Sequence, residues 1–205
     1  LIDLSPVVPI HVSAFGPRGR AVAAEMGDGW MTFVGRTASG VRDVGAMVEA
    51  CRAAGRPPET VYKTAFAMGC VLAPGEVADS PRARAQAGPF ALTFYHSLMD
   101  GSLTMRVPPA LRQAVEEYRR MYEGYEPADA RYLTLHRGHF MFVRPDEQRF
   151  LDAALLRDMT FTGGADELRD RVRTLRDAGY QQFAIFVVPG HEDALDEWAR
   201  VMEGL

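Results

Sequence analysis

The sequence lacks the features that mark several broad classes of protein. Its two cysteines, Cys51 and Cys70, cannot form a multi-disulfide framework, and they suit a reducing compartment as small buried side chains. No apolar run approaches the roughly 18 residues that a membrane-spanning helix needs, and the opening residues show no signal-peptide pattern. We therefore expect a cytoplasmic protein with no membrane partner.

An excess of basic charge is also missing. The 23 Lys and Arg residues stand against 27 Asp and Glu residues, and the formal net charge of −4 argues against a nucleic-acid partner. The sequence contains no Ser-His-Asp signature, Walker loop or Cys-x-x-Cys pair. With 205 residues, of which 47% are hydrophobic, it is an ordinary globular chain, and we expect a single domain over residues 1–205.

Apolar runs between turn signals predict strands over residues 10–14, 30–34, 61–72 and 182–188. The last run is continuously apolar from Phe183 to Val188, so we expect it to be buried on both faces of a parallel sheet. Helical patterns lie between and after these strands, at residues 19–26, 39–55, 165–179 and from about residue 192. Strands that alternate with helices of this length indicate an α/β protein built from βα units.

The middle of the chain does not fit a simple crossover between two strands. Residues 80–157 are mainly helical in pattern, and this segment is far longer than a usual connection. Ser80-Pro81 and Pro108-Pro109 mark two helix starts, and Pro89 predicts a kink in the first of these helices. We interpret residues 80–157 as a helical insertion within the single domain.

One short stretch carries a signal for a site. The apolar strand at residues 10–14 runs into Phe15-Gly16-Pro17-Arg18, and Pro17 suits the first position of the helix that follows. The first turn of that helix points free backbone N–H groups, together with Arg18, beyond the carboxyl end of the strand. Gly16 allows a ligand to approach the backbone closely. The pattern predicts an anion site, although an ordinary strand–turn–helix junction can look the same.

The same stretch resembles the luciferase-like oxidoreductases, barrel enzymes that use flavin or deazaflavin. In that family a strand ending Ser/Ala-x-Gly-Pro-Lys/Arg, a helix of small residues and an Asp-Gly-aromatic strand surround the cofactor phosphate. The chain has Ala14-Phe15-Gly16-Pro17-Arg18, then a small-residue helix, then Asp28-Gly29-Trp30. The resemblance implies a (β/α)8 TIM-barrel fold with F420 or FMN as the cofactor.

The resemblance also implies which residues bind this cofactor. We expect the phosphate at the turn and the pocket wall on the next strand, with the set Ser13, Ala14, Phe15, Gly16, Pro17, Arg18, Trp30 and Phe33. A second glycine stretch, residues 161–167, resembles the family's segment before its last crossover helix. Its carboxylates would repel a phosphate, so we expect only a structural role there. No catalytic acid or base is assigned.

The chain aligns with only part of the family's barrel. The resemblance is strongest over residues 7–73 and 158–190, and it covers the last four βα units. A complete barrel has eight strands and about 250 residues, so the first four units have no counterpart in the sequence. Because the sequence starts with Leu1 rather than methionine, three explanations stay open: an upstream half that the sequence omits, its cleavage, or its deletion.

The histidines do not predict a metal site. His136 and His139 lie close together, but a third and a fourth ligand at a recognisable spacing are missing, so we predict none. Either side chain could act as an acid or base toward a substrate, since imidazole titrates near neutrality, or could simply lie in the surface or core. We expect His96 to be an exposed helical residue. His11 either points into the barrel or is a hydrogen-bonded residue of its interior layers.

Together these observations favour an enzyme: an F420- or FMN-dependent oxidoreductase of the luciferase-like family. It would transfer hydride to or from a small organic substrate, or would monooxygenate that substrate, because the cofactor carries the chemistry. One alternative is a non-catalytic flavin- or phosphate-binding remnant that forms a structural dimer. Another is a barrel enzyme that acts on a sugar phosphate at the same anion site without a flavin.

Four strands of a barrel predict self-association. Their unpaired edges and uncovered apolar interior favour a second chain, so we expect a homodimer if no upstream half is present. Light scattering on the 205-residue chain, run alongside a cofactor-reduction assay, measures this. A stable monomer with full turnover would contradict the half-barrel interpretation.

Overall fold

The computed structural model of the chain describes residue 5, residues 7–103, residue 107 and residues 109–205. The chain divides into two compact units. The first, here called the sheet unit, consists of Leu1–Ala67, Ala165–Phe186 and Ala199–Leu205. The second, the helical unit, consists of Met68–Gly164 and Val187–Trp198.

The sheet unit is built on a four-stranded sheet with the order β1-β2-β3-β6. Its strands are β1 His11–Ser13, β2 Gly29–Phe33, β3 Tyr62–Met68 and β6 Gln182–Phe186. β1 pairs with β2, and β2 with β3, in parallel, so that Phe33 lies opposite Phe66. All four expected strands are present in a parallel α/β arrangement. The third is shorter than expected, because it ends at Met68 and a separate short strand follows.

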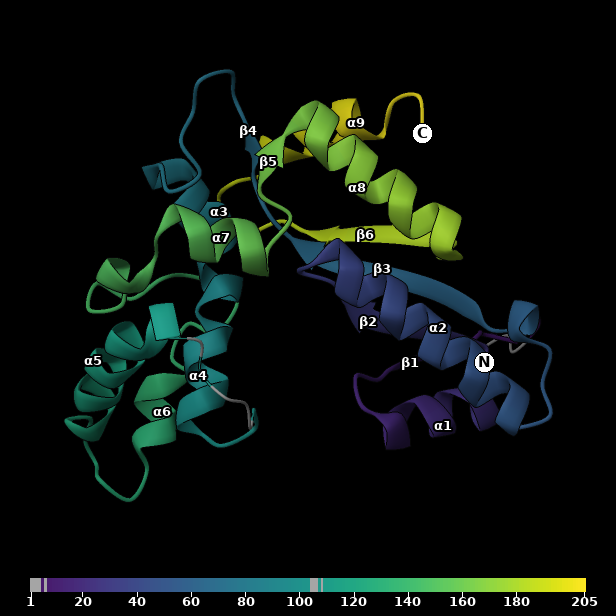
Figure 1. The fold of residues 1–205 in the computed structure, drawn as a ribbon, viewed down its shortest axis with the longest axis horizontal. Coiled ribbons are helices and arrows are strands. Elements are labelled where there is room, and N and C mark those ends of the chain that lie inside the picture. Colours follow the sequence, from purple (N-terminus) through teal and green to yellow (C-terminus); the bar gives the residue numbers. More distant parts are fainter. Residues whose placement is uncertain (1–4, 6, 104–106, 108) are drawn as a thin grey trace. The chain divides into compact units, whose positions relative to one another are not determined.

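Helices cover one face of this sheet (Figure 1). They are α1 Pro17–Met26, α2 Thr37–Ala53 and α8 Ala165–Ala178; α1 contacts α2, and α2 contacts α8. Burial alternates along β2 accordingly: Trp30 and Thr32 are buried against the helices, whereas Met31 and Phe33 are only half-buried on the other face. A short 3-10 helix, Pro58–Thr60, connects α2 to β3.

Glycines end two of these helices where the sequence predicts it. Gly55 follows α2 with φ of 70°, and Gly179 follows α8 with φ of 115°. Both values lie in the left-handed region, where a residue with a side chain is strained. The chain can therefore turn back toward β3 and β6 directly after each helix.

β6 differs from its expected environment. The sequence predicts a strand buried on both faces, but no residue of Gln182–Phe186 is fully buried. Within the described part of the chain, β6 lies at an edge of the sheet and pairs only with β3. An apolar run is typical of a buried strand. Whether the strand is in fact buried depends on other segments of the protein packing against both of its faces. The prediction of burial on both faces is therefore wrong for this structure.

The range of the helical unit includes the whole predicted helical segment, residues 80–157. Its helices are α3 Pro81–Ala91, α4 Thr93–Met99, α5 Arg112–Glu123, α6 Arg131–Leu135 and α7 Ala153–Met159, with 3-10 turns at Pro109–Leu111 and Gln148–Phe150. Ser80 caps α3 as predicted, by accepting a hydrogen bond from the Ala83 N–H at 3.1 Å. Pro89 lies inside α3, which ends two residues later, so the expected kink is a break between two helices.

A short two-stranded sheet and a closing helix complete the chain. β4 Val71–Leu72 pairs in parallel with β5 Gly163–Gly164. α9, Ala194–Met202, begins two residues after the predicted start. Pro108, one of the residues expected to start a helix, lies outside the described residues. None of the described helices has the length and apolar character to cross a bilayer.

Aromatic rings form the core of the helical unit. Tyr95 and Tyr118 stack with ring centroids 4.7 Å apart, and Phe150 meets Tyr118 edge-on at 4.9 Å. Val115 lies beside them and is 2% exposed, so this side of α5 faces the aromatic core. This core joins α4, α5 and the 3-10 turn before α7.

Gly69 is expected to be indispensable to the helical unit. A Cβ atom at this position would lie 1.9 Å from the backbone oxygen of Phe161, whose N–H donates to Met68 O at 2.9 Å. Because neither backbone can yield cheaply, Gly69→Ala should lower the free energy of unfolding by roughly 1–3 kcal/mol or more. Urea unfolding measures this. Gly164→Ala, where a Cβ meets no described atom within 4 Å, should change stability by about 0.5 kcal/mol at most; equal losses would contradict the assignment.

Candidate anion and cofactor site

The turn between β1 and α1 leaves the start of the helix open. Gly16 is the N-cap and Pro17 the first helical residue, and within the described structure no side chain caps the helix. The first helical hydrogen bond runs from the Arg20 N–H to Gly16 O at 3.0 Å. In the described residues, the N–H groups of Arg18 and Gly19 have no partner. They are donors available to an anion at the positive end of a ten-residue helix.

The carbonyl groups of the same turn are all occupied. Ala14 O accepts from the indole Nε1 of Trp30 at 2.8 Å, and Phe15 O accepts from Nη1 of Arg20 at 2.8 Å. Gly16 O accepts the first helical hydrogen bond. A carbonyl oxygen facing an anion would repel it, and here all three are held by donors. The turn therefore offers N–H groups to a ligand while its acceptors are bound within the chain.

Gly16 leaves open space beside the turn, and Gly19 allows the helix to pack closely on the strand end. A Cβ on Gly16 would meet no described atom within 4 Å, so the space beside this residue is open. A Cβ on Gly19 would lie 2.9 Å from the Cβ of Ala14. Gly19 therefore allows α1 to pack directly on the end of β1, which keeps the N–H groups near the strand's carboxyl end.

The charges around the turn are basic on balance. The first turn of α1 has no acidic residue, and Arg18 is exposed. Arg20 lies 3.6 Å from Asp43 of α2 while it binds Phe15 O. Burial raises the pKa of Asp43, although Arg20 and Arg42 act in the opposite direction. Arg20 thus holds the backbone, and Arg18 is the guanidinium that remains directed to solvent.

A row of phenyl rings begins beside the turn. Phe15 stacks on Phe33 with centroids 5.7 Å apart, Phe33 meets Phe66 edge-on at 4.7 Å, and Phe66 is 6.3 Å from Phe186. Phe15 is 55% exposed, and the other three are half-buried. The row lies on the sheet face that α1, α2 and α8 do not cover. It provides an apolar surface next to the candidate anion site.

Trp30 lies on the opposite face from Phe33. Its side chain is fully buried and stacks on Tyr180 with centroids 6.0 Å apart. The sequence resemblance expects Trp30 to line the pocket, whereas its contact with the turn in the structure is the hydrogen bond to Ala14 O. Ser13 is exposed at the end of β1 and pairs with Met31 of β2. Its side chain therefore lies on the same face of the sheet as those of Met31 and Phe33.

The histidines lie in different surroundings from those the sequence predicts. His96 is 3% exposed and its Nε2 lies 2.8 Å from Oε1 of Glu147, so the prediction of an exposed residue is wrong. The tertiary fold buries this face of α4 under the segment that follows α6. His136 and His139 lie next to His96, and burial lowers the pKa of His139. His11 is exposed in the sheet unit, with its ring 5.6 Å from that of Tyr62.

The helical unit also contains an open cavity of about 690 Å³. Three segments far apart in the sequence line it, and they include Arg84, Phe142 and His191. Arg84 is held in place by Asp79 at 3.3 Å and by the backbone oxygen of Gln148 at 2.9 Å. The cavity has the size of a small-molecule pocket with a mixed apolar and basic wall. No single sequence motif signals it, because its walls meet only in the fold.

The strand–turn–helix arrangement and the parallel sheet agree with a family comparison. A profile of the family described as luciferase-like monooxygenase matches residues 3–182. The chain belongs to this family. A search of curated proteins gave no match.

Two solved structures of similar fold are F420-dependent enzymes. The coenzyme F420-dependent tetrahydromethanopterin reductase from Methanopyrus kandleri is 17% identical, with a TM-score of 0.57, and the match covers 94% of this chain and 49% of that one. An F420-dependent secondary alcohol dehydrogenase, solved with an F420–acetone adduct, is 16% identical with a TM-score of 0.56, over 97% and 49% of the two chains. The chain thus spans about half the length of these structures, and its fold corresponds to part of the family's barrel.

The hydrogen bond from Trp30 to Ala14 is expected to stabilise the turn. Trp30→Phe keeps an aromatic ring but removes the only donor on that side chain, which leaves a buried carbonyl without a partner. We expect the free energy of unfolding to fall by about 1–3 kcal/mol in urea titrations. Tyr62→Phe, which removes an exposed hydroxyl 3.4 Å from Gln181 O, should cost about 0.5 kcal/mol or less. A Trp30→Phe protein as stable as the wild type would contradict this role.

Proposed function

We propose that the chain provides the cofactor-phosphate site of an oxidoreductase that uses F420 or FMN. The observation that carries the proposal is the uncapped start of α1, where the N–H groups of Arg18 and Gly19 stay available while all three carbonyls of the turn are bound. Membership of the luciferase-like family supports it. Both cofactors carry phosphate, so this site serves either one.

The residues present fit such a group. Gly16 leaves open space where any other residue would place a side chain, and Arg18 supplies an exposed guanidinium suited to bidentate phosphate binding. The exposed ring of Phe15 and the half-buried ring of Phe33 give an apolar surface for an aromatic ring system. In this proposal Trp30 and Arg20 position the turn, while Ser13 to Arg18 and Phe33 face the cofactor.

This placement gives the cofactor and the protein residues different roles. When bound, the flavin or deazaflavin supplies the hydride or oxygen chemistry. The chain's own residues anchor the phosphate, fix the direction of approach and exclude water with the phenyl row. None of these residues needs to exchange a proton at the turn, which agrees with the lack of a carboxylate in the first turn of α1.

Substrate and assembly belong to the same proposal. We infer a small organic substrate that undergoes either hydride transfer or monooxygenation, and a homodimer in the cytoplasm. The cavity beside Arg84 and Phe142 is a pocket of suitable size within the helical unit. The half-exposed sheet face and the two sheet edges of the described residues favour association with a second chain.

Gly16→Val tests the phosphate site with little risk to folding. Gly16 has φ −101° and ψ 171°, which any residue adopts, and a side chain there meets no described atom. The valine would occupy the space that a phosphate needs. We expect affinity for F420 or FMN, measured by fluorescence titration, to fall tenfold or more, about 1.4 kcal/mol.

Gly45→Val is the matched control, because a Cβ at this exposed position of α2 likewise meets nothing within 4 Å among the described residues. It should leave cofactor affinity unchanged. A folded Gly16→Val protein with wild-type affinity for both cofactors would refute the phosphate site. Cofactor binding by the wild type without turnover on any substrate would favour the non-catalytic alternative.

A further inference from the structure

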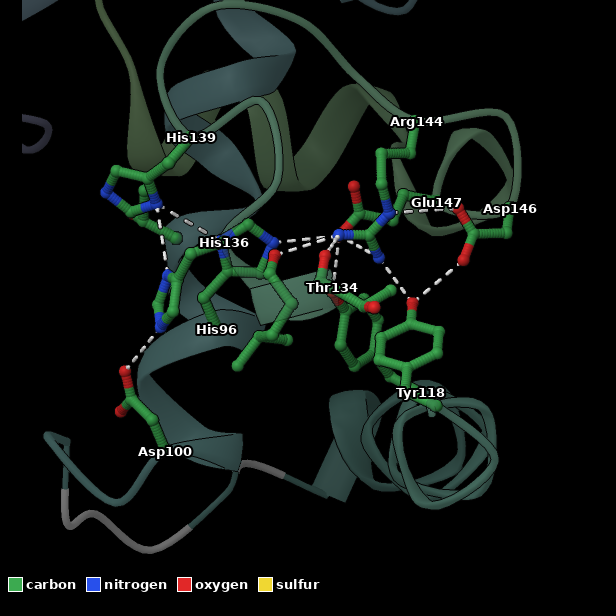
Figure 2. A network of polar contacts seen from close by, with 12 residues as sticks. His96, Asp100, Tyr118, Thr134, His136, His139, Arg144, Asp146 and Glu147 are labelled. Atoms are coloured by element: carbon green, nitrogen blue, oxygen red, sulfur yellow. Dashed lines mark hydrogen bonds and ion pairs between the residues drawn. The ribbon is translucent and has the colours of Figure 1, made fainter. Parts of the chain in front are cut away.

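Three histidines converge in the helical unit (Figure 2), whereas the proposed cofactor turn belongs to the sheet unit. His96 lies on α4, His136 directly follows α6, and His139 lies in the turn after it. The Nδ1 atom of His139 is 3.4 Å from Nδ1 of His96 and 3.5 Å from Nδ1 of His136. One ring nitrogen from each of the three lies within 4.8 Å of the other two.

These separations are those of ligands around a single cation. Two nitrogens that each lie about 2.0–2.1 Å from a tetrahedral zinc ion are about 3.3–3.4 Å apart. The two short Nδ1 separations therefore already match, and the third pair of ring nitrogens lies within 4.8 Å. The sequence offers His136 and His139 only three residues apart; the fold adds His96, which is 40 residues upstream of His136.

The outer nitrogen of His96 is held by a carboxylate. Its Nε2 lies 2.8 Å from Glu147 Oε1, and the same carboxylate accepts the Tyr118 hydroxyl hydrogen and pairs with Arg144 at 3.1 Å. Donors thus surround Glu147, which acts as an acceptor. The hydrogen between His96 and Glu147 therefore belongs to Nε2, and Nδ1 of a neutral His96 presents its lone pair to the other histidines.

His136 has the same arrangement at its outer nitrogen. Its Nε2 lies 3.2 Å from Asp100 Oδ2, so Nε2 donates and Nδ1 presents a lone pair toward His139. His139 carries at most one hydrogen on Nδ1, so it can donate a full hydrogen bond to His96 or to His136 but not to both. With three neutral rings, the centre of the cluster holds more lone pairs than hydrogens. A cation there would satisfy all three nitrogens.

We propose that His96, His136 and His139 bind a divalent transition-metal cation of the zinc type. Glu147 and Asp100 orient two of the ligands through their outer nitrogens, the carboxylate–histidine arrangement that metal sites use to fix ring tautomer and basicity. Imidazole ligands suit zinc, copper, iron and nickel rather than calcium or magnesium. The proposal does not depend on the cofactor proposed above, because it concerns a separate cluster of residues.

The site would have both structural and chemical consequences. Three protein ligands leave a coordination position open to water or another small ligand, as in catalytic zinc sites. The side chain of His136 is 35% exposed while that of His96 is 4% exposed, so the cluster opens to solvent on the His136 side. A bound cation would also join α4 to the segment after α6, where Gly138 with φ of 81° turns the chain between the two ligands.

Metal analysis of the full chain, purified without a polyhistidine tag, tests the proposal. After treatment with chelator and titration with Zn²⁺, we expect one equivalent to bind and the melting temperature to rise. Co²⁺ in its place should give the visible absorption bands of a four-coordinate site with nitrogen ligands. His136→Asn and His139→Asn should abolish stoichiometric binding, and Asp100→Asn should weaken it roughly 10–100-fold.

His191→Asn is the matched control, because it removes a histidine of the same unit that lies outside the cluster. It should keep one equivalent of Zn²⁺. Binding below one equivalent by the wild type, or equal binding by wild type and His139→Asn, would overturn the proposal. Circular dichroism of each variant shows whether it is folded; if both histidine variants unfold, the Zn²⁺ titration of the wild type and of Asp100→Asn decides the question.

Discussion

The sheet unit depends on the close approach of α1 to the end of β1. Gly19 has no side chain and so lets the helix lie against Ala14. The indole N–H of Trp30 donates a hydrogen bond to the carbonyl oxygen of the same alanine. These two contacts fix where the helix begins relative to the strand. The direction of its free N–H groups, on which the proposed anion site depends, follows from them, because backbone donors cannot rotate independently of the helix.

Buried polar groups impose a comparable constraint on the helical unit. Glu147 is 1% exposed, and Tyr118, Arg144 and His96 all meet its carboxylate. A buried carboxylate without donors would destabilise the fold by several kcal/mol, so these partners must be present together. The same contacts that satisfy Glu147 also set the direction of the His96 ring. The hydrogen bonds that the buried Glu147 carboxylate needs therefore also orient His96, the candidate metal ligand.

Local patterns predicted the parts of the fold that depend on nearby residues. Ser80 capping α3, Gly55 and Gly179 ending helices and the turn at Gly16-Pro17 were predicted correctly, because each depends on backbone geometry within a few positions. Roles that depend on the direction in which a side chain points were not predicted. Arg20 and Trp30 hold the carbonyls of the turn, yet nothing in their neighbourhood along the chain signals this role.

The sequence by itself determined the alternation of strands and helices, the family resemblance and the open start of α1, since these rest on periodicity and on one short motif. Only the tertiary structure decided what is buried. It left β6 partly exposed, because an apolar strand is covered only where other segments supply neighbours. It also buried His96 and carried it to His136 and His139, because helix packing joins residues that no spacing rule connects.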